Sequence, residues 1–504
     1  MDSDKPRLNW RTFALCVIIS FGQFVGAYES VIIGTTLQKP DFMRRMGLWD
    51  INGNETSRYS SLEGAIVGLF QAGAVFGSLI VAAVMERWGR KAGLIFGSLI
   101  SLPALAGMTG SMNVAEFLVF RFIAGLGTWA CGSAASVYIP ELAPPAYRGF
   151  FAGLNGVMIG FGVASASYTG MGFYFCDNEV VSWRAPMGIP LFAPILILCA
   201  IPFLPESPRY LLLKDRPEEA RRIFDRLNQS SSANPSLLDE EFSQIQQQAA
   251  YDRILDSSWK GLFIRPAYRK RIILACMLSS LNQSTGVLVI NNYGQTFYET
   301  LGFSPSARQL LQGNRDIIAF LGNFLGSWIV DRVGRKPLLL FSLAGCFCCI
   351  LLEGIMVHVY AYSDNFGGKN AGVALLYIFL FFYAVGIDVG TYVYLGEMFP
   401  NHLRVKGVGM SLASLNVTAT VYLSVTGTAI ASIGWKFFLV FAAITFCGMI
   451  WIYFFLPETR RLPLEEIEAL FGNAEDTMVF ISPANRGLEG ERAGQEKGAV
   501  EHVE

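Results

Sequence analysis

Long apolar runs alternate with short polar segments along most of this 504-residue chain. A helix needs about 20 apolar residues to cross a bilayer, and each run is close to that length. The pattern therefore predicts twelve membrane-spanning helices, in two sets of six. The spans are expected near 12–37, 62–85, 92–111, 115–139, 149–174, 187–204, 271–297, 309–330, 337–360, 371–396, 405–430 and 434–456. The fifth, seventh and tenth carry enough polar residues to be marginal by hydropathy alone.

A charged stretch separates the two sets of runs and contains helix-like pieces. Its excess of Lys and Arg predicts that it lies in the cytoplasm, by the positive-inside rule. Because the number of predicted spans is even, both chain ends are expected on that same side. The predicted segments are a cytoplasmic N-terminus at 1–11, a six-helix half at 12–204, a cytoplasmic linker with short helices at 205–270, a second six-helix half at 271–458 and a cytoplasmic tail at 459–504.

Two short motifs occur once in each half. The motif Glu86-Arg-Trp-Gly-Arg-Lys91 returns as Asp331-Arg-Val-Gly-Arg-Lys336, 245 residues later. The motif Glu141-Leu-Ala-Pro144 returns as Glu397-Met-Phe-Pro400, 256 residues later. Two parallel six-helix halves explain both repeats, so the expected fold class is an all-α integral membrane protein. Membrane proteins with that layout bind small solutes near mid-membrane, between the halves.

Composition narrows the classes of protein further. Hydrophobic residues make up 52% of the chain and charged residues only 16%, whereas soluble domains have about a quarter charged residues. The net charge of −1 argues against nucleic acid as a partner and leaves the lipid bilayer as the expected surroundings. The nine Cys lie mostly inside apolar runs and the three His are scattered, so neither a disulfide framework nor a metal site is expected. No catalytic motif or cofactor loop occurs, so an enzyme is not predicted.

Three further motifs accompany the paired Gly-Arg-Lys loops. They are Arg121-Phe-Ile-Ala-Gly125 in the fourth run, Pro205-Glu-Ser-Pro-Arg209 after the sixth and Pro457-Glu-Thr-Arg460 after the twelfth. With these motifs the chain resembles the sugar porter family of the major facilitator superfamily, over roughly residues 12–472. The segment Thr285–Tyr293 is similar to a fungal branch of that family. The resemblance implies a transporter that carries a monosaccharide by alternating access, expected to be a monomer in the plasma membrane with no cofactor.

The resemblance also implies a network of charges at the cytoplasmic ends of the helices. The matching residues are Arg90, Glu141, Arg148 and Glu206 in the first half and Arg335, Glu397, Arg404 and Glu458 in the second. Such ion pairs can lock the cytoplasmic side in one state and break in another. The alternative is a set of static pairs and topology signals, since exposed ion pairs contribute only about 0–1 kcal/mol each.

A single acid, Glu29, lies in the first apolar run, far from any other charge. Acids at membrane depth are costly and usually functional. The resemblance implies that Glu29 pairs with Arg121, and that protonation of the acid couples proton entry to sugar transport. Where the family commonly has Asp, this chain has the longer Glu, which leaves the geometry open. The alternative is a structural ion pair that pins two helices together.

The seventh run has the densest polar residues and supplies most candidates for substrate binding. They are Asn282, Gln283, Asn291, Asn292 and Tyr293. Amide side chains offer the paired donors and acceptors that sugar hydroxyls need, and the resemblance implies that the family's Gln-Gln pair is here Asn282-Gln283. On a straight helix Gln283 and Asn292 would face opposite ways, and Gly286 is a candidate position for a break between them. The alternative is that these amides hold neighbouring helices together.

Several positions depart from the family pattern. Where the family has polar residues in the fifth, seventh and eighth spans, this chain has Gly156, Leu288 and Ala319. Asn155 is the remaining candidate in the fifth span. In the tenth span Tyr392 takes the place of the family's Trp, and Asp388 is a new acid one helical turn earlier. Either the sugar differs from an ordinary hexose, or the ligand is a polyol, a sugar acid or another small metabolite.

Two further expectations concern features outside the binding region. Asn54-Glu55-Thr56 is a glycosylation sequon in a predicted outside loop, or a chance match. A non-transporting sugar sensor, which would share the fold, is the main alternative from another functional class.

Overall fold

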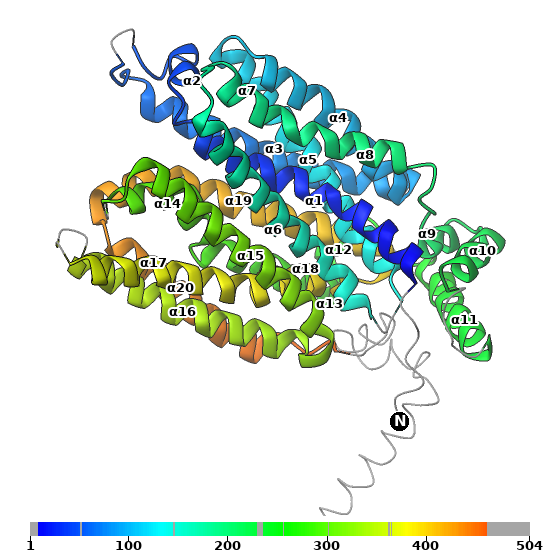
Figure 1. Ribbon diagram of the computed structural model, residues 1–504. Helices are drawn as coiled ribbons and strands as arrows, with labels where there is room; N and C mark the ends of the chain where they lie inside the picture. The colour runs from blue at the N-terminus through cyan, green and yellow to red at the C-terminus, as the bar shows by residue number, and fades with distance from the viewer. Residues whose placement is uncertain are drawn as a thin grey trace, which may run out of the picture.

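The computed structural model describes residues 9–50, 53–144, 147–228, 235–255, 257–300, 302–360, 363 and 365–460. Within these residues every regular element is helical, apart from an isolated β-bridge between Trp49 and Glu55. Figure 1 shows two elongated helical bundles side by side, with a group of short helices at one end. Most of the predicted N-terminus at 1–11 and tail at 459–504 lies outside the described residues.

The helices follow the chain from one bundle to the other. The first bundle contains α1 (Trp10–Thr36), α2 (Pro40–Arg45), α3 (Tyr59–Trp88), α4 (Arg90–Gly110), α5 (Val114–Leu142), α6 (Arg148–Gly172), η2 (Phe173–Phe175), α7 (Val181–Gly188), η3 (Ile189–Leu191) and α8 (Phe192–Ala200). The connecting stretch contains α9 (Pro208–Leu213), α10 (Pro217–Asn228), α11 (Pro235–Asp252) and α12 (Trp259–Ile264). The second bundle contains α13 (Pro266–Ser284), α14 (Val287–Thr300), α15 (Pro305–Val333), α16 (Arg335–Tyr360), α17 (Phe366–Phe382), the π-helix η4 (Tyr383–Asp388), α18 (Val389–Met398), α19 (Asn401–Ile433) and α20 (Lys436–Phe455).

Eleven helices among the described residues are long and apolar enough to cross a membrane. The remaining predicted span, the eighth, is α15, which has 29 residues but carries Arg315 and Asp316 near one end and Asp331 and Arg332 at the other. These charges shorten its uninterrupted apolar segment. The fifth, seventh and tenth predicted spans all pass on length and apolarity, the fifth with one of the lowest mean hydropathies, while α15 does not.

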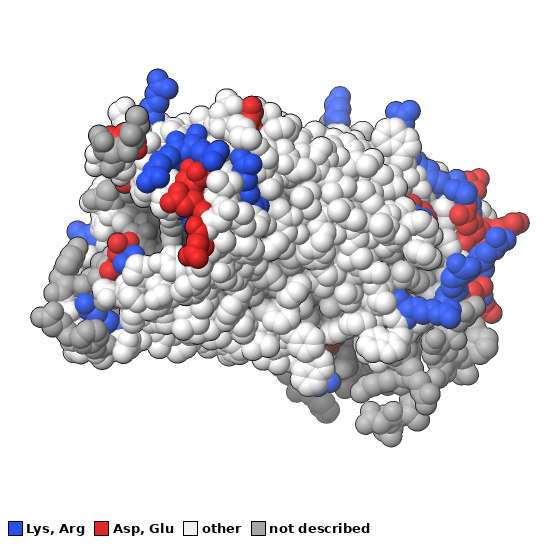
Figure 2. Space-filling view, turned by 45° about the horizontal axis from the view of Figure 1, so that its top comes forward, with Lys and Arg blue, Asp and Glu red and all other residues white. Residues whose placement is uncertain are grey.

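The surface agrees with a membrane setting. In the view of Figure 2, Lys, Arg, Asp and Glu gather toward the two ends of the molecule and the middle is almost free of them. Large apolar side chains are exposed halfway along several helices, as at Leu99 of α4, Leu321 of α15 and Val421 of α19. Apolar side chains in such positions are stable against lipid tails and would be costly in water.

The paired loops turn on two glycines with left-handed backbone. Gly89 has φ +100 and Gly334 has φ +106, conformations that L side chains rarely adopt. A Cβ on Gly89 would lie 2.4 Å from Oε2 of Glu206, and one on Gly334 would lie 2.9 Å from Oε2 of Glu458. Glycine at these turns therefore lets an acid from a distant segment approach the start of α4 and of α16.

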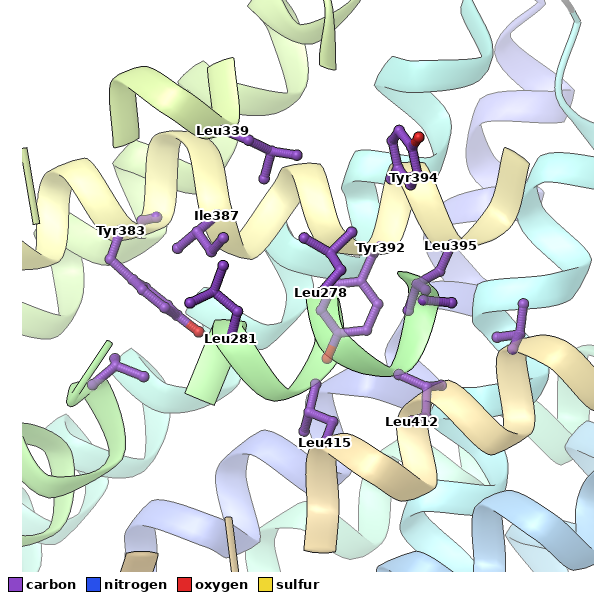
Figure 3. Packing of buried hydrophobic residues seen from close by; sticks show 14 of the residues in the cluster. Leu278, Leu281, Leu339, Tyr383, Ile387, Tyr392, Tyr394, Leu395, Leu412 and Leu415 are labelled. Carbon is purple, nitrogen blue, oxygen red and sulfur yellow. The ribbon is translucent and has the colours of Figure 1, made fainter. Parts of the chain in front are cut away.

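Two spans of the second bundle are irregular where they pass its middle. The seventh span breaks between α13 and α14 at Gly286, whose φ is +89, so the sequence-based candidate for the break is confirmed. The tenth span contains η4, held by Ser342 of α16, whose Oγ accepts from the Ile387 N–H at 2.9 Å. Figure 3 shows Tyr383, Ile387 and Tyr392 of this span beside leucines of α13 and α19. Irregular backbone at membrane depth is found where it is buried in protein or lines a cavity.

Candidate binding cavity and charge networks

A cavity of about 120 Å³ lies between the two bundles. Its walls come from α1, α3, α5 and α6 of the first bundle and from α13, α14, α15, α17, η4, α18 and α19 of the second. The bundles pack against each other beside it, α6 against α15 and α3 against α19. A cavity of this size holds several water molecules or a small organic molecule.

Four of the predicted substrate-binding residues line this cavity, namely Gln283, Asn291, Asp388 and Tyr392. Asn282 is buried directly behind the wall, where its Oδ1 accepts from the Tyr383 hydroxyl at 2.8 Å and from Nε2 of Gln283 at 2.9 Å. Asn282 therefore orients two lining residues.

The other three candidates are not placed in the cavity wall. Asn155 is buried in α6, donates to the Ala152 carbonyl at 2.9 Å and is absent from the lining among the described residues. The side chains of Asn292 and Tyr293 lie outside the described part of the structure.

Several unpaired polar atoms lie in the cavity wall. Six buried side-chain atoms of lining residues have no hydrogen-bond partner within the described chain: Gln71 Oε1, Trp129 Nε1, Gln283 Oε1, Asn291 Oδ1, Asn323 Oδ1 and Asn416 Oδ1. A buried polar atom without a partner costs about 1–3 kcal/mol, so native proteins rarely leave one without water or a ligand. The wall is therefore built to receive a molecule that has several hydrogen-bonding groups.

The sequence patterns had not singled out several of these lining residues. Asn323 lies one helical turn after Ala319, so the two share the face of α15 that lines the cavity. Its Nδ2 donates to the Gly156 carbonyl at 2.8 Å and to Asp388 Oδ2 at 3.0 Å. Gln71, Trp129 and Asn416 could have been found only by noting isolated polar groups inside apolar runs.

The predicted pair of Glu29 and Arg121 is formed beside the cavity. Nη1 of Arg121 lies 3.2 Å from Oε2 of Glu29, and both side chains are fully buried. Nη2 of Arg121 donates to the Glu29 carbonyl at 3.0 Å and Nε to the Ile66 carbonyl at 3.3 Å. Oε1 of Glu29 has no partner among the described residues. The carboxylate thus holds one end of the guanidinium while keeping one oxygen open to a proton or a water.

The charge network of the first bundle forms at the end where the short helices lie. Arg90 makes two bonds of 2.8 Å to the carboxylate of Glu141. Glu206 accepts from the backbone N–H of Arg90 at 3.0 Å, and burial raises the pKa of this loop carboxyl, against the lowering effect of the backbone donors. Arg148 is buried at the first position of α6 and lines a small cavity together with Glu141.

The second bundle repeats this arrangement. Arg335 donates to Glu397 at 2.6 and 3.1 Å, and Glu458 accepts from the Arg335 backbone N–H at 3.0 Å. Arg335 also lies 3.0 Å from Asp331. The repeated motifs in the sequence therefore correspond to two equivalent three-dimensional networks.

Contacts between the bundles join the two networks. Arg404 of the second bundle lies 3.6 Å from Glu141 of the first. Lys406 donates to Glu86 at 2.7 Å, and Asp331 accepts from the Phe150 N–H at 2.8 Å. These contacts hold the two bundles together at the end of the molecule that carries the networks.

A second buried ion pair, absent from the sequence-based candidates, lies toward the opposite end of α15. Arg315 Nη2 is 3.0 Å from Asp316 Oδ1, and Arg315 Nη1 donates to the Ile290 carbonyl of α14 at 2.9 Å. Asp316 accepts from the Ser167 hydroxyl of α6, which connects the two bundles. Two adjacent charges in an apolar run are the same signal that identified Glu29, and that signal was available in the sequence.

The remaining predictions fall on the surface. Asn54 is exposed in the loop between α2 and α3, where its backbone N–H donates to Asp50 at 2.8 Å, so its glycosylation stays a prediction. The described residues contain no group of three or more His, Cys, Asp and Glu that could hold a metal ion.

Comparisons with known proteins cover nearly the whole chain. The family model described as Sugar (and other) transporter matches residues 15–471. A low-affinity glucose transporter of Kluyveromyces lactis is 28% identical over 96% of this chain and 87% of its own length. A probable quinate permease of Neosartorya fischeri is 27% identical over 93% of this chain and 88% of its own length. The structure of the proton:xylose symporter XylE bound to 6-bromo-6-deoxy-D-glucose has a TM-score of 0.79 and 21% identity, over 92% of this chain and 99% of that one.

Proposed function

We propose that this chain, which belongs to the sugar (and other) transporter family, carries a small polyhydroxylated solute across a membrane by alternating access. The resemblance found in the motifs and the predicted fold class, the major facilitator fold, are confirmed. The chain is a multi-pass membrane protein of a transporter family and not an enzyme. Within that class we propose a monosaccharide as the substrate, with the plasma membrane as its location and a monomer as its working form.

The set of unpaired polar atoms in the cavity wall is the observation that carries this proposal. Five of the six are amide oxygens, which accept hydrogen bonds, and the sixth is the Trp129 indole N–H, which donates one. A sugar ring carries several hydroxyls, each of which can both donate and accept. Its flat apolar faces suit the aromatic and aliphatic part of the wall, which includes Phe70, Tyr392 and Leu423. A hydroxyl-rich ligand would therefore satisfy a wall that is otherwise short of partners.

Alternating access is supported by the contacts between the bundles at both ends of the cavity. Toward one end they are the ion pairs of Arg404 and Lys406 with the first bundle. Toward the other, Ser167 bonds to Asp316, and Gln309 Nε2 donates to Gln38 at 3.2 Å. We propose that the two sets of contacts open in turn, the charged end toward the cytoplasm. Opening one set of contacts while the other forms would leave the two states similar in stability.

Proton coupling through Glu29 is the finer part of the proposal. The buried pair with Arg121 beside the cavity provides a group that can exchange a proton without leaving the membrane. XylE, whose fold this chain shares, is described as a proton:xylose symporter. We propose that protonation of Glu29 releases Arg121 and permits the loaded protein to change state.

Substitution of Gln283 tests the cavity as the substrate site. We expect Gln283→Ala to raise the KM for the transported solute by roughly 3- to 10-fold, the effect of one lost hydrogen bond of about 0.5–1.5 kcal/mol. Expression should be unchanged, because Asn282 keeps its bond from Tyr383. The measurement is initial uptake against solute concentration, with surface protein quantified in the same cells.

A matched control is available in Gln312→Ala. Gln312 is also buried and has an unpaired Oε1 among the described residues, but it does not line the cavity. Its substitution should leave the KM unchanged. A KM that is unaltered in well-expressed Gln283→Ala, or altered equally in both variants, would remove the cavity from the proposal.

A further inference from the structure

Asp388 places a carboxyl group in the wall of the cavity. The side chain is 6% exposed and lines the cavity, and its Oδ2 accepts from Nδ2 of Asn323 at 3.0 Å. It is the one Asp or Glu among the described lining residues. A carboxylate there can accept two or more hydrogen bonds from neighbouring hydroxyls of a ligand.

The fold positions this carboxyl by a local distortion of the tenth span. Asp388 is the last residue of the π-helix η4, and single π-turns of this kind are frequent at functional sites. The Ile387 N–H is taken up by Ser342, and the Ile387 carbonyl accepts from Thr391 at 2.6 Å and from Asn282 at 3.3 Å. Because both backbone groups of Ile387 have partners in neighbouring side chains, the surrounding helices hold the distortion next to Asp388 in place.

The groups around Asp388 bring no positive charge to it. The other ionisable side chains that its own span brings to the cavity wall are the hydroxyls of Tyr383 and Tyr392, and α15 and α13 contribute the amides of Asn323 and Gln283. Arg121 is the one Lys or Arg among the described lining residues. Its guanidinium is already bound to the Glu29 carboxylate and to two backbone carbonyls.

We propose that Asp388 is a specificity-determining residue that makes this cavity take neutral polyhydroxylated ligands and exclude those that carry a carboxylate. The inference rests on the proposed function and names the substrate class of the same site. A carboxylate ligand would be placed near Asp388 with no free cation to offset the repulsion, while a neutral sugar can donate its hydroxyls to the same oxygens. Two like charges in a buried site repel strongly, so an acid ligand can enter only if it or Asp388 takes up a proton, and we expect this requirement to lower its affinity by about a hundredfold at a pH where both carboxyls are ionised.

The relatives make this distinction informative. Proteins described as a glucose transporter and as a probable quinate permease match this chain about equally well, so overall identity does not separate a neutral substrate from an acidic one. The charges in the cavity wall, an Asp388 without a basic partner among the described residues and an Arg121 that is already bound to Glu29, favour the neutral substrate over the acidic one.

The test compares matched pairs of probes that differ in one carboxylate. D-glucose and D-glucuronate, D-galactose and D-galacturonate, and the acid quinate are titrated against the purified native protein, and binding is followed by intrinsic fluorescence and by uptake into proteoliposomes. We expect the native protein to bind at least one neutral sugar about a hundredfold more tightly than its acid. In Asp388→Asn, which keeps the size of the side chain, this ratio should fall at least tenfold through a gain in affinity for the acid.

The controls separate charge from folding and from the transport function. Glu353→Gln removes another buried acid, in α16, that does not line the cavity, and it should leave the ratio at the native value. Asp388→Glu keeps the charge and should keep the preference for the neutral sugar. A native protein that prefers the acids, or an unchanged ratio in folded Asp388→Asn, would overturn the inference and leave the transporter function standing. Failure of the native protein to bind any probe would overturn both.

Discussion

Glu29→Gln is expected to abolish accumulation of substrate against a concentration gradient while leaving exchange of substrate across the membrane. Gln has the size of protonated Glu but cannot release a proton. Arg121 would therefore permanently lack the charged carboxylate with which it pairs in the native protein. The inward proton gradient would then have no group through which to drive transport. The native protein should take up substrate faster as the external pH falls, and uptake by the variant should be independent of pH.

The measurement is uptake into proteoliposomes with and without an inward proton gradient. The native protein should accumulate substrate above the external concentration, and the variant should reach a ratio of about one, as expected when the coupled ion contributes no free energy. Glu353→Gln serves as the matched control, since Glu353 is another buried acid but has no basic partner in the described residues. It should accumulate substrate as the native protein does.

Two results would contradict this role for Glu29. If well-expressed Glu29→Gln accumulated substrate to the same ratio as the native protein, the coupled proton would have to bind at another residue. Loss of folded protein in Glu29→Gln, with normal kinetics in the fraction that folds, would mean that the pair with Arg121 only holds α1 and α5 together. A native protein without pH-driven uptake would be a facilitator.

Gly73→Ala is expected to cause a large loss of stability through the contact of α3 with α5. The two helices α3 and α5 approach so closely that a Cβ on Gly73 would lie 2.0 Å from the Phe122 carbonyl oxygen and 3.0 Å from the Leu126 N. Both are backbone atoms and cannot turn aside, so the helices must separate. Overpacking of this kind typically lowers the free energy of unfolding by about 1–3 kcal/mol. Because the contact here is with rigid backbone, we expect a loss at or above the upper end of that range.

Gly68 on the same helix provides the comparison. Nothing lies within 4 Å of a Cβ built on Gly68, so alanine there removes only the flexibility of glycine and should stabilise α3 by up to about 1 kcal/mol. Thermal unfolding of purified protein in detergent, together with the yield of monodisperse protein, measures both effects. Equal melting temperatures for the two variants would show that α3 and α5 do not pack as described.

The sequence predicted the architecture because the membrane imposes a simple pattern on it. Two six-helix halves can be identified without any knowledge of packing. The evidence is the length of the apolar spans, the positive charge of the loops and the repeat of Glu86–Lys91 at Asp331–Lys336. Glu29 could be singled out for a similar reason, since an acid in an apolar run is costly and usually functional, whereas its partner Arg121 came from the resemblance to the family.

The details of the cavity could not be predicted in the same way. In a soluble helix the polar face marks the outside, but a helix in lipid is apolar both toward lipid and toward its neighbours, so the pattern does not tell which face lines a cavity. Asn323, one turn from the position that the family pattern indicated, illustrates this point. The position of Asn282 behind the wall depends on η4 and on Thr391, which lie more than 100 residues away in sequence.

Counterflow in proteoliposomes tests the central claim most directly. Vesicles that contain the purified native protein would be loaded with a single unlabelled neutral sugar or polyol, and entry of the same labelled compound followed over time. We predict saturable, transient accumulation of at least one neutral monosaccharide or polyol, and a higher KM for that compound in Gln283→Ala. Specific binding of such a compound without counterflow, under conditions in which the protein is folded, would contradict the account and would identify the protein as a sensor.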